Sequence, residues 1–224
     1  MKIILLPGLD GTGLLFDKLK ESFPENLDIE VISYDSLEGI SYSEQASEIA
    51  NRFEGIDIYI VGESYSGRVA YELFKLRRHR VKGIVFLAGF ISSPSILSKF
   101  AGFVPVSLIA PNFLTKNLLY LLGFSLIGGS SLSERVFASI SKANKYKLKS
   151  RLRNIAGLDE PAQSITCPVT YIRPSKDLLV SASAVRFLSK KCSSFIQVTV
   201  NGGHFIAQSN PVECAQVICN AANM

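Results

Sequence analysis

The sequence has few of the residues that mark disulfide-rich or fibrous proteins. Only 4 of its 224 residues are cysteine, and these four form no CxxC pair. A chain of this length does not need disulfides to fold, so we expect free thiols in a reducing compartment. The 16 glycines have no triplet period, which excludes a collagen-like chain. With 47% hydrophobic and 19% charged residues, the chain is also too apolar for a disordered protein. The length and composition are typical of a single domain with a large hydrophobic core.

Long uninterrupted apolar runs are also missing. The apolar run at the N-terminus breaks at Pro7-Gly8, which is too early for the core of a signal peptide. The most apolar stretch, residues 104–129, is interrupted by prolines, asparagines and a lysine, so it is not a plain membrane span. Residues 104–129 could still form a helical segment that is buried or lies at an interface. We therefore expect a cytoplasmic protein.

The net charge of +5 comes from one segment, which we call the basic run. Nucleic-acid binding needs a basic face together with a reading element, and the sequence has no zinc-finger spacing, aromatic RNA-binding signature or basic leucine-zipper pattern. We therefore expect no nucleic-acid partner. The basic run is either a solvated helix face or a surface for an anionic lipid. Its members are Lys142, Lys145, Lys147, Lys149, Arg151 and Arg153.

Short apolar segments alternate with amphipathic helical segments along most of the chain. The patterns predict strands at residues 2–6, 29–34, 56–61, 83–88, 169–173 and 195–200. They predict helices at residues 12–23, 43–53, 65–78, 183–190 and 212–221. The side chains expected to be buried include Leu14 in the first helix and Leu76 in the third. Near-continuous apolar strands separated by helices predict an α/β fold, with an open, mostly parallel sheet covered by helices on both faces.

The alternation stops after Phe90 and resumes at Pro168. The residues between are rich in Leu, Ile, Phe and Ser and have helical rather than strand spacing. The chain therefore consists of one α/β core with a helical insertion.

The segment GESYSG, residues 62–67, lies where a predicted strand meets a predicted helix. A serine becomes a nucleophile when a base takes its proton, and a sharp strand-to-helix turn lifts its side chain out of the sheet. The backbone is crowded there, so small residues are needed two positions before and after, and Gly62 and Ser66 meet that need. The pattern is GxSxS followed by Gly67, rather than GxSxG. We interpret Ser64 as a nucleophile, with a helix N-cap serine as the alternative.

A second glycine-rich loop, LLPGLDGTG at residues 5–13, lies between the first strand and the first helix. A tetrahedral intermediate needs two backbone donors, one from the residue after the nucleophile and one from such a loop. These would be the N–H groups of Tyr65 and Leu9. The phosphate-binding patterns GxxxxGK[ST] and GxGxxG are absent. A tight turn with a helix cap at Asp10 or Thr12 is a second interpretation, compatible with the first.

The chain offers two histidines as the base. His79 lies in a cationic cluster at a helix end, which favours a solvated role. His204 follows the last predicted strand, at the edge where open α/β sheets bind ligands. We interpret His204 as the base, with a turn histidine as the alternative.

An acid should orient this base and stabilise its charged form. Asp177 comes directly after the preceding predicted strand, at the same sheet edge as His204. We interpret Asp177 as the acid, although a capping or turn role is common for Asp in loops. Asp35 and Glu63 could also reach this edge. Asp10 could too, but it would crowd the oxyanion and is better interpreted as a loop-shaping residue.

The order Ser64, Asp177, His204 resembles that of the α/β-hydrolase fold superfamily, and the resemblance covers nearly the whole chain. The PGLDGTG loop is similar to that of small serine esterases and plastid-type esterase/acyltransferases. The resemblance implies that Ser64 is the nucleophile, His204 the base and Asp177 the acid. It also implies that Leu9 and Tyr65 are the oxyanion donors.

Three features depart from the family pattern. Ser66 replaces a glycine, and Pro7 stands where many members have histidine. The chain also starts at the family's third strand, which implies a sheet of about six strands. Residues 1–91 and 161–224 correspond to the family's core.

Residues 92–160 correspond to the family's cap, or lid. Its apolar side chains suggest a lipophilic acyl pocket, although they could also only attach the cap to the core. The candidate pocket residues are Phe100, Phe103, Phe113, Leu121 and Phe124.

These features predict a serine hydrolase that cleaves a small-molecule carboxylic ester or thioester, with no metal or cofactor. Acyl transfer to an alcohol is the close variant, and a cofactor-independent lyase is a third option. A catalytically inactive binding module is the hypothesis from another class. Dehalogenase and epoxide-hydrolase chemistry are disfavoured because relatives with those activities have a carboxylate where this chain has Ser64.

Overall fold

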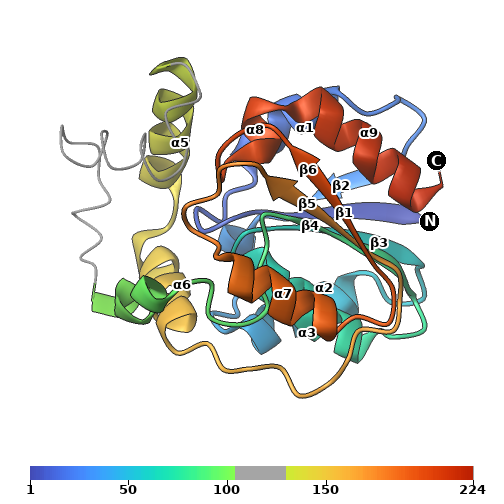
Figure 1. The fold of residues 1–224 in the computed structure, drawn as a ribbon, viewed down its shortest axis with the longest axis horizontal. Helices are drawn as coiled ribbons and strands as arrows, with labels where there is room; N and C mark the ends of the chain where they lie inside the picture. Colours follow the sequence, from blue (N-terminus) through green and yellow to red (C-terminus); the bar gives the residue numbers. More distant parts are fainter. Residues whose placement is uncertain (104–129, 224) are drawn as a thin grey trace.

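The computed structural model describes residues 1–103 and 130–223. Its strands form one six-stranded sheet in the order β2-β1-β3-β4-β5-β6, and every neighbouring pair is parallel (Figure 1). This confirms the predicted α/β fold. The strands are β1 (Lys2–Leu6), β2 (Ile29–Val31), β3 (Ile58–Glu63), β4 (Val81–Leu87), β5 (Val169–Pro174) and β6 (Phe195–Val200).

Helices cover both faces of the sheet, with α1, α8 and α9 on one face and α2, α3 and α7 on the other (Figure 1). The α-helices are α1 (Asp17–Glu21), α2 (Tyr42–Arg52), α3 (Ser66–Leu76), α5 (Ser130–Lys142), α6 (Lys145–Ala156), α7 (Ala182–Lys190), α8 (Ile206–Ser209) and α9 (Pro211–Ala222). Among the described residues, the 3-10 helices are η1 (Leu14–Phe16), η2 (Tyr34–Ser36) and η3 (Ile96–Phe103).

Alternating side chains of β1 divide the core into two apolar layers. Ile3 and Leu5 pack in the cluster that includes Leu19 of α1 and Ile218 of α9. Ile4 and Leu6 belong to the cluster on the α2 and α3 face. Because successive strand residues point to opposite faces, a strand buried on both sides must be apolar at every position. The run KIILL meets this requirement.

Helix starts are fixed locally by side chains that satisfy free backbone N–H groups. At α2 the Ser41 hydroxyl accepts from the Glu44 N–H, and the Glu44 carboxylate accepts from the Ser41 N–H, which is a complete capping box. At α6 and α7 only the N-cap side chain takes part: the side chains of Asn144 and Ser181 accept hydrogen bonds from backbone N–H groups of the first turn.

The structure corrects several details of the sequence prediction. The strand expected at 29–34 ends at Val31, and α8 was not predicted. Leu14 is 42% exposed because the first helix opens with a 3-10 turn, whose three-residue period shifts side chains away from the expected face. Leu76 is 53% exposed because it is the last residue of α3.

The described parts of the helical insertion are η3, α5 and α6. Helix α5 packs on η1 through Val136 and Leu15, with Phe205 against the same cluster. Within residues 1–103 and 130–223, no helix has the length and apolar character needed to cross a bilayer. Phe113, Leu121 and Phe124 lie outside the described residues.

The connections between strands determine which loops meet. From β1 the chain passes through α1 to β2 on one side, whereas β3 lies on the other side of β1. The order therefore reverses at the β1–β3 pair, and open α/β sheets bind ligands at the carboxyl ends of strands beside such a reversal. The loop at residues 7–13 and the turn at Ser64 both follow these ends.

Leu73 and Leu76 of α3 provide a matched test of this packing. Leu73 is fully buried, so we expect Leu73→Ala to lower the free energy of unfolding by about 3 kcal/mol. We expect Leu76→Ala to change it by about 0.5 kcal/mol or less. Urea unfolding of both variants measures the difference, and equal losses would contradict the packing of α3 described here.

Candidate active site

Ser64 lies in a strained turn between β3 and α3. Its φ of 50° is in the left-handed region, which non-glycine residues rarely adopt. Backbone hydrogen bonds hold this conformation: the Ser64 N–H donates to Leu87 O at 3.0 Å, and Ser64 O accepts from the Gly67 N–H at 3.0 Å. Such strain persists only where the surroundings impose it, and it is typical of a nucleophile turn.

Two glycines make room for this turn. A Cβ at Gly62 would lie 2.9 Å from Ser66 O, and a Cβ at Gly67 would lie 2.5 Å from the backbone N and O of Phe90. In both cases the obstacle is backbone, which a side-chain rotation cannot clear. Ser66 stands where the GxSxG pattern has its second glycine. The next residue, Gly67, is the one that cannot carry a side chain, because the Phe90 backbone packs against it.

Ser66 has a contact of its own. Its buried hydroxyl hydrogen-bonds to the Tyr34 hydroxyl and donates to the carbonyl of Pro7. The hydroxyl therefore ties the first turn of α3 to the loop that follows β1. No sequence pattern indicates Tyr34 as a partner, because η2 is remote from both motifs along the chain.

The loop after β1, residues 7–13, is a closed turn. The Gly11 N–H donates to Gly8 O at 3.1 Å. The carboxylate of Asp10 accepts from the Thr12 N–H at 3.0 Å and from the Ser139 hydroxyl of α5 at 2.8 Å. The Leu9 and Tyr65 N–H groups donate to no other residue of the described chain. Two backbone donors, in the loops that follow β1 and β3, thus have no partner among the described residues.

The structure brings Ser64, His204 and Asp177 together in one hydrogen-bonded series. His204 Nε2 lies 2.8 Å from Ser64 Oγ, and His204 Nδ1 lies 3.1 Å from both carboxylate oxygens of Asp177. The side chains of His204 and Asp177 are only 6% and 5% exposed. This geometry allows Nδ1–H to donate to Asp177 and leaves Nε2 free to accept the serine proton.

Local backbone contacts position the acid and the base. The N–H groups of Leu179 and Val180 donate to Asp177 Oδ1 at 2.9 and 3.0 Å. The Lys176 N–H donates to Gly202 O at 3.0 Å. The loops that follow β5 and β6 are therefore joined directly.

The electrostatic environment favours the charged forms of this pair. Burial lowers the pKa of His204, but the charge and hydrogen bond of Asp177 and the charge of Glu63 outweigh it, so the pKa lies above its ordinary value. Burial raises the pKa of Asp177, but the charge and hydrogen bond of His204 and the two backbone donors outweigh it, so the pKa lies below its ordinary value. Asp177 is therefore ionised over the pH range in which His204 titrates.

The other candidate acids have different partners. Glu63 is buried and accepts from Gln208 Nε2 at 2.9 Å, and burial raises its pKa to about 7. Asp35 accepts from the Asn144 N–H at 3.0 Å. Asp10 accepts from Thr12 of its own loop and from Ser139 of α5, as described above. Within the described residues, no group of His, Cys, Asp and Glu side chains could hold a metal ion.

The prediction that the whole basic run is a surface is wrong. Arg151 is fully buried, and Lys147 donates to the carbonyls of Asp35 and Leu37. These two residues are one helical turn apart, so they share the face of α6 that packs inward with Leu148 and Leu152. The four exposed members of the run are Lys142, Lys145, Lys149 and Arg153.

The two described aromatic candidates of the cap do not line an enclosed pocket. Phe100 is 63% exposed and Phe103 is 83% exposed, and both lie on η3. Their sequence composition indicated burial, but only tertiary packing decides which apolar side chains of an insertion face inward.

We expect Asp177→Asn to lower the pKa of His204, because the substitution removes the charge that raises this pKa and leaves the burial that lowers it. Titration of the His204 ring by NMR measures the change, with His79 as the internal reference. An unchanged His204 pKa would show that another group determines it.

No protein-family model and no curated protein matches the chain by sequence. Solved structures do match it. A hydrolase from Oleispira antarctica superposes with a TM-score of 0.79 at 14% identity, covering 100% of this chain and 92% of that one. A thermophilic esterase from Thermogutta terrifontis gives 0.80 at 13% identity, covering 100% and 89%.

A thioesterase from the prodiginine biosynthetic pathway of Streptomyces coelicolor gives a TM-score of 0.73 at 15% identity, covering 100% of this chain and 90% of that one. These neighbours are hydrolases, esterases and thioesterases, and the likeness extends over the complete sheet and its helices. The chain has the α/β-hydrolase fold.

Proposed function

We propose that this protein is a serine hydrolase that cleaves a small-molecule carboxylic ester or thioester through Ser64, His204 and Asp177. The observation that carries the proposal is the hydrogen-bonded series at 2.8 and 3.1 Å. The N–H groups of Leu9 and Tyr65, which have no partner among the described residues, are the proposed oxyanion donors. The structural neighbours support the reaction class, because they include esterases and a thioesterase.

In the first half of the reaction, His204 Nε2 takes the proton of the Ser64 hydroxyl while Oγ forms a bond to the substrate carbonyl carbon. The carbonyl oxygen becomes an oxyanion, which the N–H groups of Leu9 and Tyr65 stabilise. The bond to the alcohol or thiol then breaks, and the leaving group takes the proton from Nε2. An acyl group remains on Ser64, and Asp177 stabilises the transient imidazolium.

In the second half, His204 takes a proton from water, and the resulting hydroxide attacks the acyl carbon. This attack forms a second tetrahedral intermediate. Its breakdown releases the carboxylic acid, and His204 Nε2 returns the proton to Ser64 Oγ. The base must be neutral in both halves. Because the pKa of His204 is raised above its ordinary value of 6.5, we expect turnover to fall as the pH is lowered through that raised pKa.

Two alternatives use the same site. An alcohol in place of water would make the enzyme an acyltransferase, and product analysis with added alcohols distinguishes the two. A catalytically inactive binding module would show no turnover. The triad geometry and the strained turn at Ser64 favour an enzyme over the binding module, because strain of this kind is costly and is typical of active sites.

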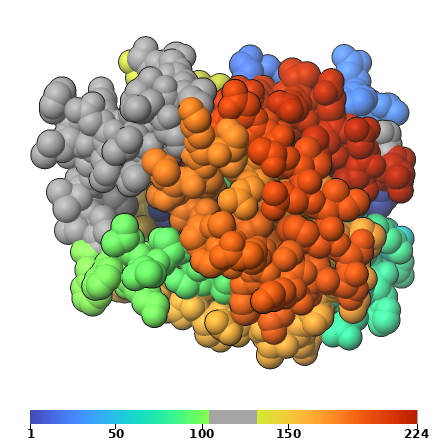
Figure 2. Space-filling model, in the orientation of Figure 1, coloured from blue at the N-terminus to red at the C-terminus, as the bar shows by residue number. Residues whose placement is uncertain are grey.

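The described part of the insertion suits an amphipathic substrate. We propose residues 92–160 as a cap over the 1–91 and 161–224 core. The segment that contains η3 lies at one edge of the molecule (Figure 2). Helix η3 exposes large apolar side chains and packs against α6, which carries Lys145, Lys149 and Arg153. We propose that this surface holds an anionic head group or contacts an anionic lipid, with a lipophilic acyl chain directed to Ser64. The exposed apolar residues are Ile96, Leu97, Phe100 and Phe103.

The cysteines support a reducing compartment such as the cytoplasm. All four are free, and Cys167 and Cys214 are buried. Burial raises the pKa of both thiols to about 12, so neither is a reactive thiolate at neutral pH.

A fluorophosphonate probe tests the nucleophile. We expect the probe to label Ser64 in the wild type, because the activated hydroxyl attacks phosphorus and the backbone N–H groups stabilise the phosphoryl oxygen. Mass spectrometry of the tryptic peptides locates the label. Ser47→Ala is the control, since this serine is exposed on α2 and makes no contact with the turn at Ser64. An unlabelled wild type, or labelling that survives Ser64→Ala, would contradict the proposal.

Substrate series test the acyl and charge preferences. We expect kcat/KM to rise from acetyl to octanoyl p-nitrophenyl esters, because each buried CH₂ contributes about 0.8 kcal/mol. We expect Lys145→Glu with Lys149→Glu to raise KM for octanoyl coenzyme A by about fivefold, at roughly 0.5 kcal/mol for each exposed charge, and to leave KM for p-nitrophenyl octanoate unchanged.

Lys18→Glu with Lys20→Glu is the control, since both lysines are exposed on α1 and the change in net charge is identical. High salt should weaken the α6 effect, because exposed charges are screened. Equal changes in KM for the anionic and neutral substrates would show that Lys145 and Lys149 are solvated surface residues that do not bind the head group. A higher kcat/KM for acetyl esters than for octanoyl esters would contradict the proposed lipophilic pocket.

A further inference from the structure

Arg151 connects the insertion to the loop after β1. It lies on α6 and is fully buried, which is unusual for a charged side chain. Its Nε donates to Leu9 O at 2.7 Å, and its Nη2 donates to Asp10 O at 2.7 Å. The guanidinium fork therefore binds two successive carbonyls of the loop that contains the proposed oxyanion donor.

The loop is shaped to accept this guanidinium. Gly11 has a φ of +70°, and a Cβ at this position would lie 2.5 Å from the guanidinium carbon of Arg151. A side chain at residue 11 would therefore be strained by the backbone conformation and would displace the guanidinium. The glycine that forms the tight turn also provides the room for Arg151.

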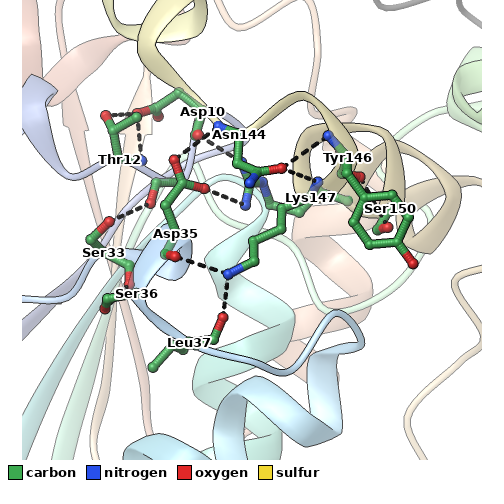
Figure 3. Close-up of polar contacts among 12 residues, drawn as sticks. Asp10, Thr12, Ser33, Asp35, Ser36, Leu37, Asn144, Tyr146, Lys147 and Ser150 are labelled. Atoms are coloured by element: carbon green, nitrogen blue, oxygen red, sulfur yellow. Dashed lines mark hydrogen bonds and ion pairs between the residues drawn. The ribbon is translucent and has the colours of Figure 1, made fainter.

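The neighbouring carboxylate does not compete for the fork. Asp35 Oδ1 is 3.6 Å from Arg151 Nη1, whereas Asp35 Oδ2 accepts from the Asn144 N–H. Figure 3 shows the start of α6, where the Asn144 N–H and the Lys147 ammonium are directed toward Asp35. Asp35 thus partly balances the buried charge, while the two shortest donors of Arg151 go to the loop.

A chain of hydrogen bonds leads from Arg151 to Leu9. Arg151 binds the carbonyl of Asp10, and the same planar peptide carries the Gly11 N–H, which donates to Gly8 O at 3.1 Å. The Gly8 carbonyl in turn shares its peptide with the Leu9 N–H. Because N–H and C=O are trans in a peptide, each bond fixes the direction of the next N–H. Hydrogen bonds in such a chain also polarise one another, so a cation at one end strengthens the donor at the other.

We propose that Arg151 is a positioning residue that orients and polarises the Leu9 N–H through this chain, so that the insertion controls the oxyanion site. The catalytic part of this inference rests on the proposed function, whereas the structural part does not. Arg151 makes no contact with the substrate in this account.

Lys147 offers a matched control. It lies on the same face of α6 and also donates to two backbone carbonyls, those of Asp35 and Leu37, which are outside the oxyanion loop. Lys147→Met and Arg151→Met therefore each remove a cation and its carbonyl contacts from α6. Only Arg151→Met breaks the chain to Leu9.

We expect Arg151→Met to lower kcat for p-nitrophenyl octanoate by about tenfold or more with KM changed less than about twofold, since loss of a complete oxyanion donor costs about 10²–10³ in kcat. Arg151→Lys, which keeps the charge, should recover part of the loss. Lys147→Met should keep kcat within about twofold of the wild type. Hydrogen exchange of the peptide containing residues 7–13 should quicken in Arg151→Met and not in Lys147→Met.

Two results would overturn the proposal: equal kcat in the two Met variants, or unchanged exchange of residues 7–13 in Arg151→Met. If Arg151→Met does not fold, Arg151→Gln replaces it, because glutamine keeps one donor without the charge. A wild type that neither hydrolyses esters nor reacts with a fluorophosphonate would refute the proposed function instead. The exchange measurement would still decide whether Arg151 holds the loop.

Discussion

The parallel pairing of β1 with β3 places the proposed oxyanion loop beside the proposed nucleophile. Leu5 pairs with Val61 and Leu6 with Gly62, so the two strands end at the same edge. Neighbouring strands are about 4.8 Å apart, which brings residues 7–13 within reach of the turn at Ser64. The pairing of β5 with β6 does the same for the loops that carry Asp177 and His204. Every other feature of the site refines positions that these strand pairs determine.

Close packing then removes the remaining freedom at the nucleophile turn. Gly62 and Gly67 allow backbone approaches that a Cβ would block, and the Ser66 hydroxyl binds the loop at Pro7. From the other side, Arg151 binds Leu9 and Asp10. The proposed oxyanion loop is therefore held by the core and by the insertion together, and donors that are oriented before the substrate binds would need no reorganisation during the reaction.

The fold and the three residues of the series could be predicted from the sequence, because Ser64, Asp177 and His204 each lie within four residues of the end of a strand of the parallel sheet. The contacts of Ser66 and Arg151 could not, since they depend on how distant segments pack. Arg151 was grouped with surface cations, although its spacing with Leu148 and Leu152 places it on the inward face of α6. The exposure of η3 was missed for the same reason, because composition alone does not show which apolar side chains find a partner.

The proposed function requires an acyl group to be carried covalently on Ser64. Rapid quenching of the wild type with p-nitrophenyl octanoate, followed by mass spectrometry of the peptides, tests it most directly. We expect an octanoyl group on Ser64 that is released as octanoate, and a longer-lived acyl-enzyme in His204→Ala once it has formed, because water then lacks its base. Ester turnover without an acyl group on Ser64, or with the acyl group on another residue, would contradict it.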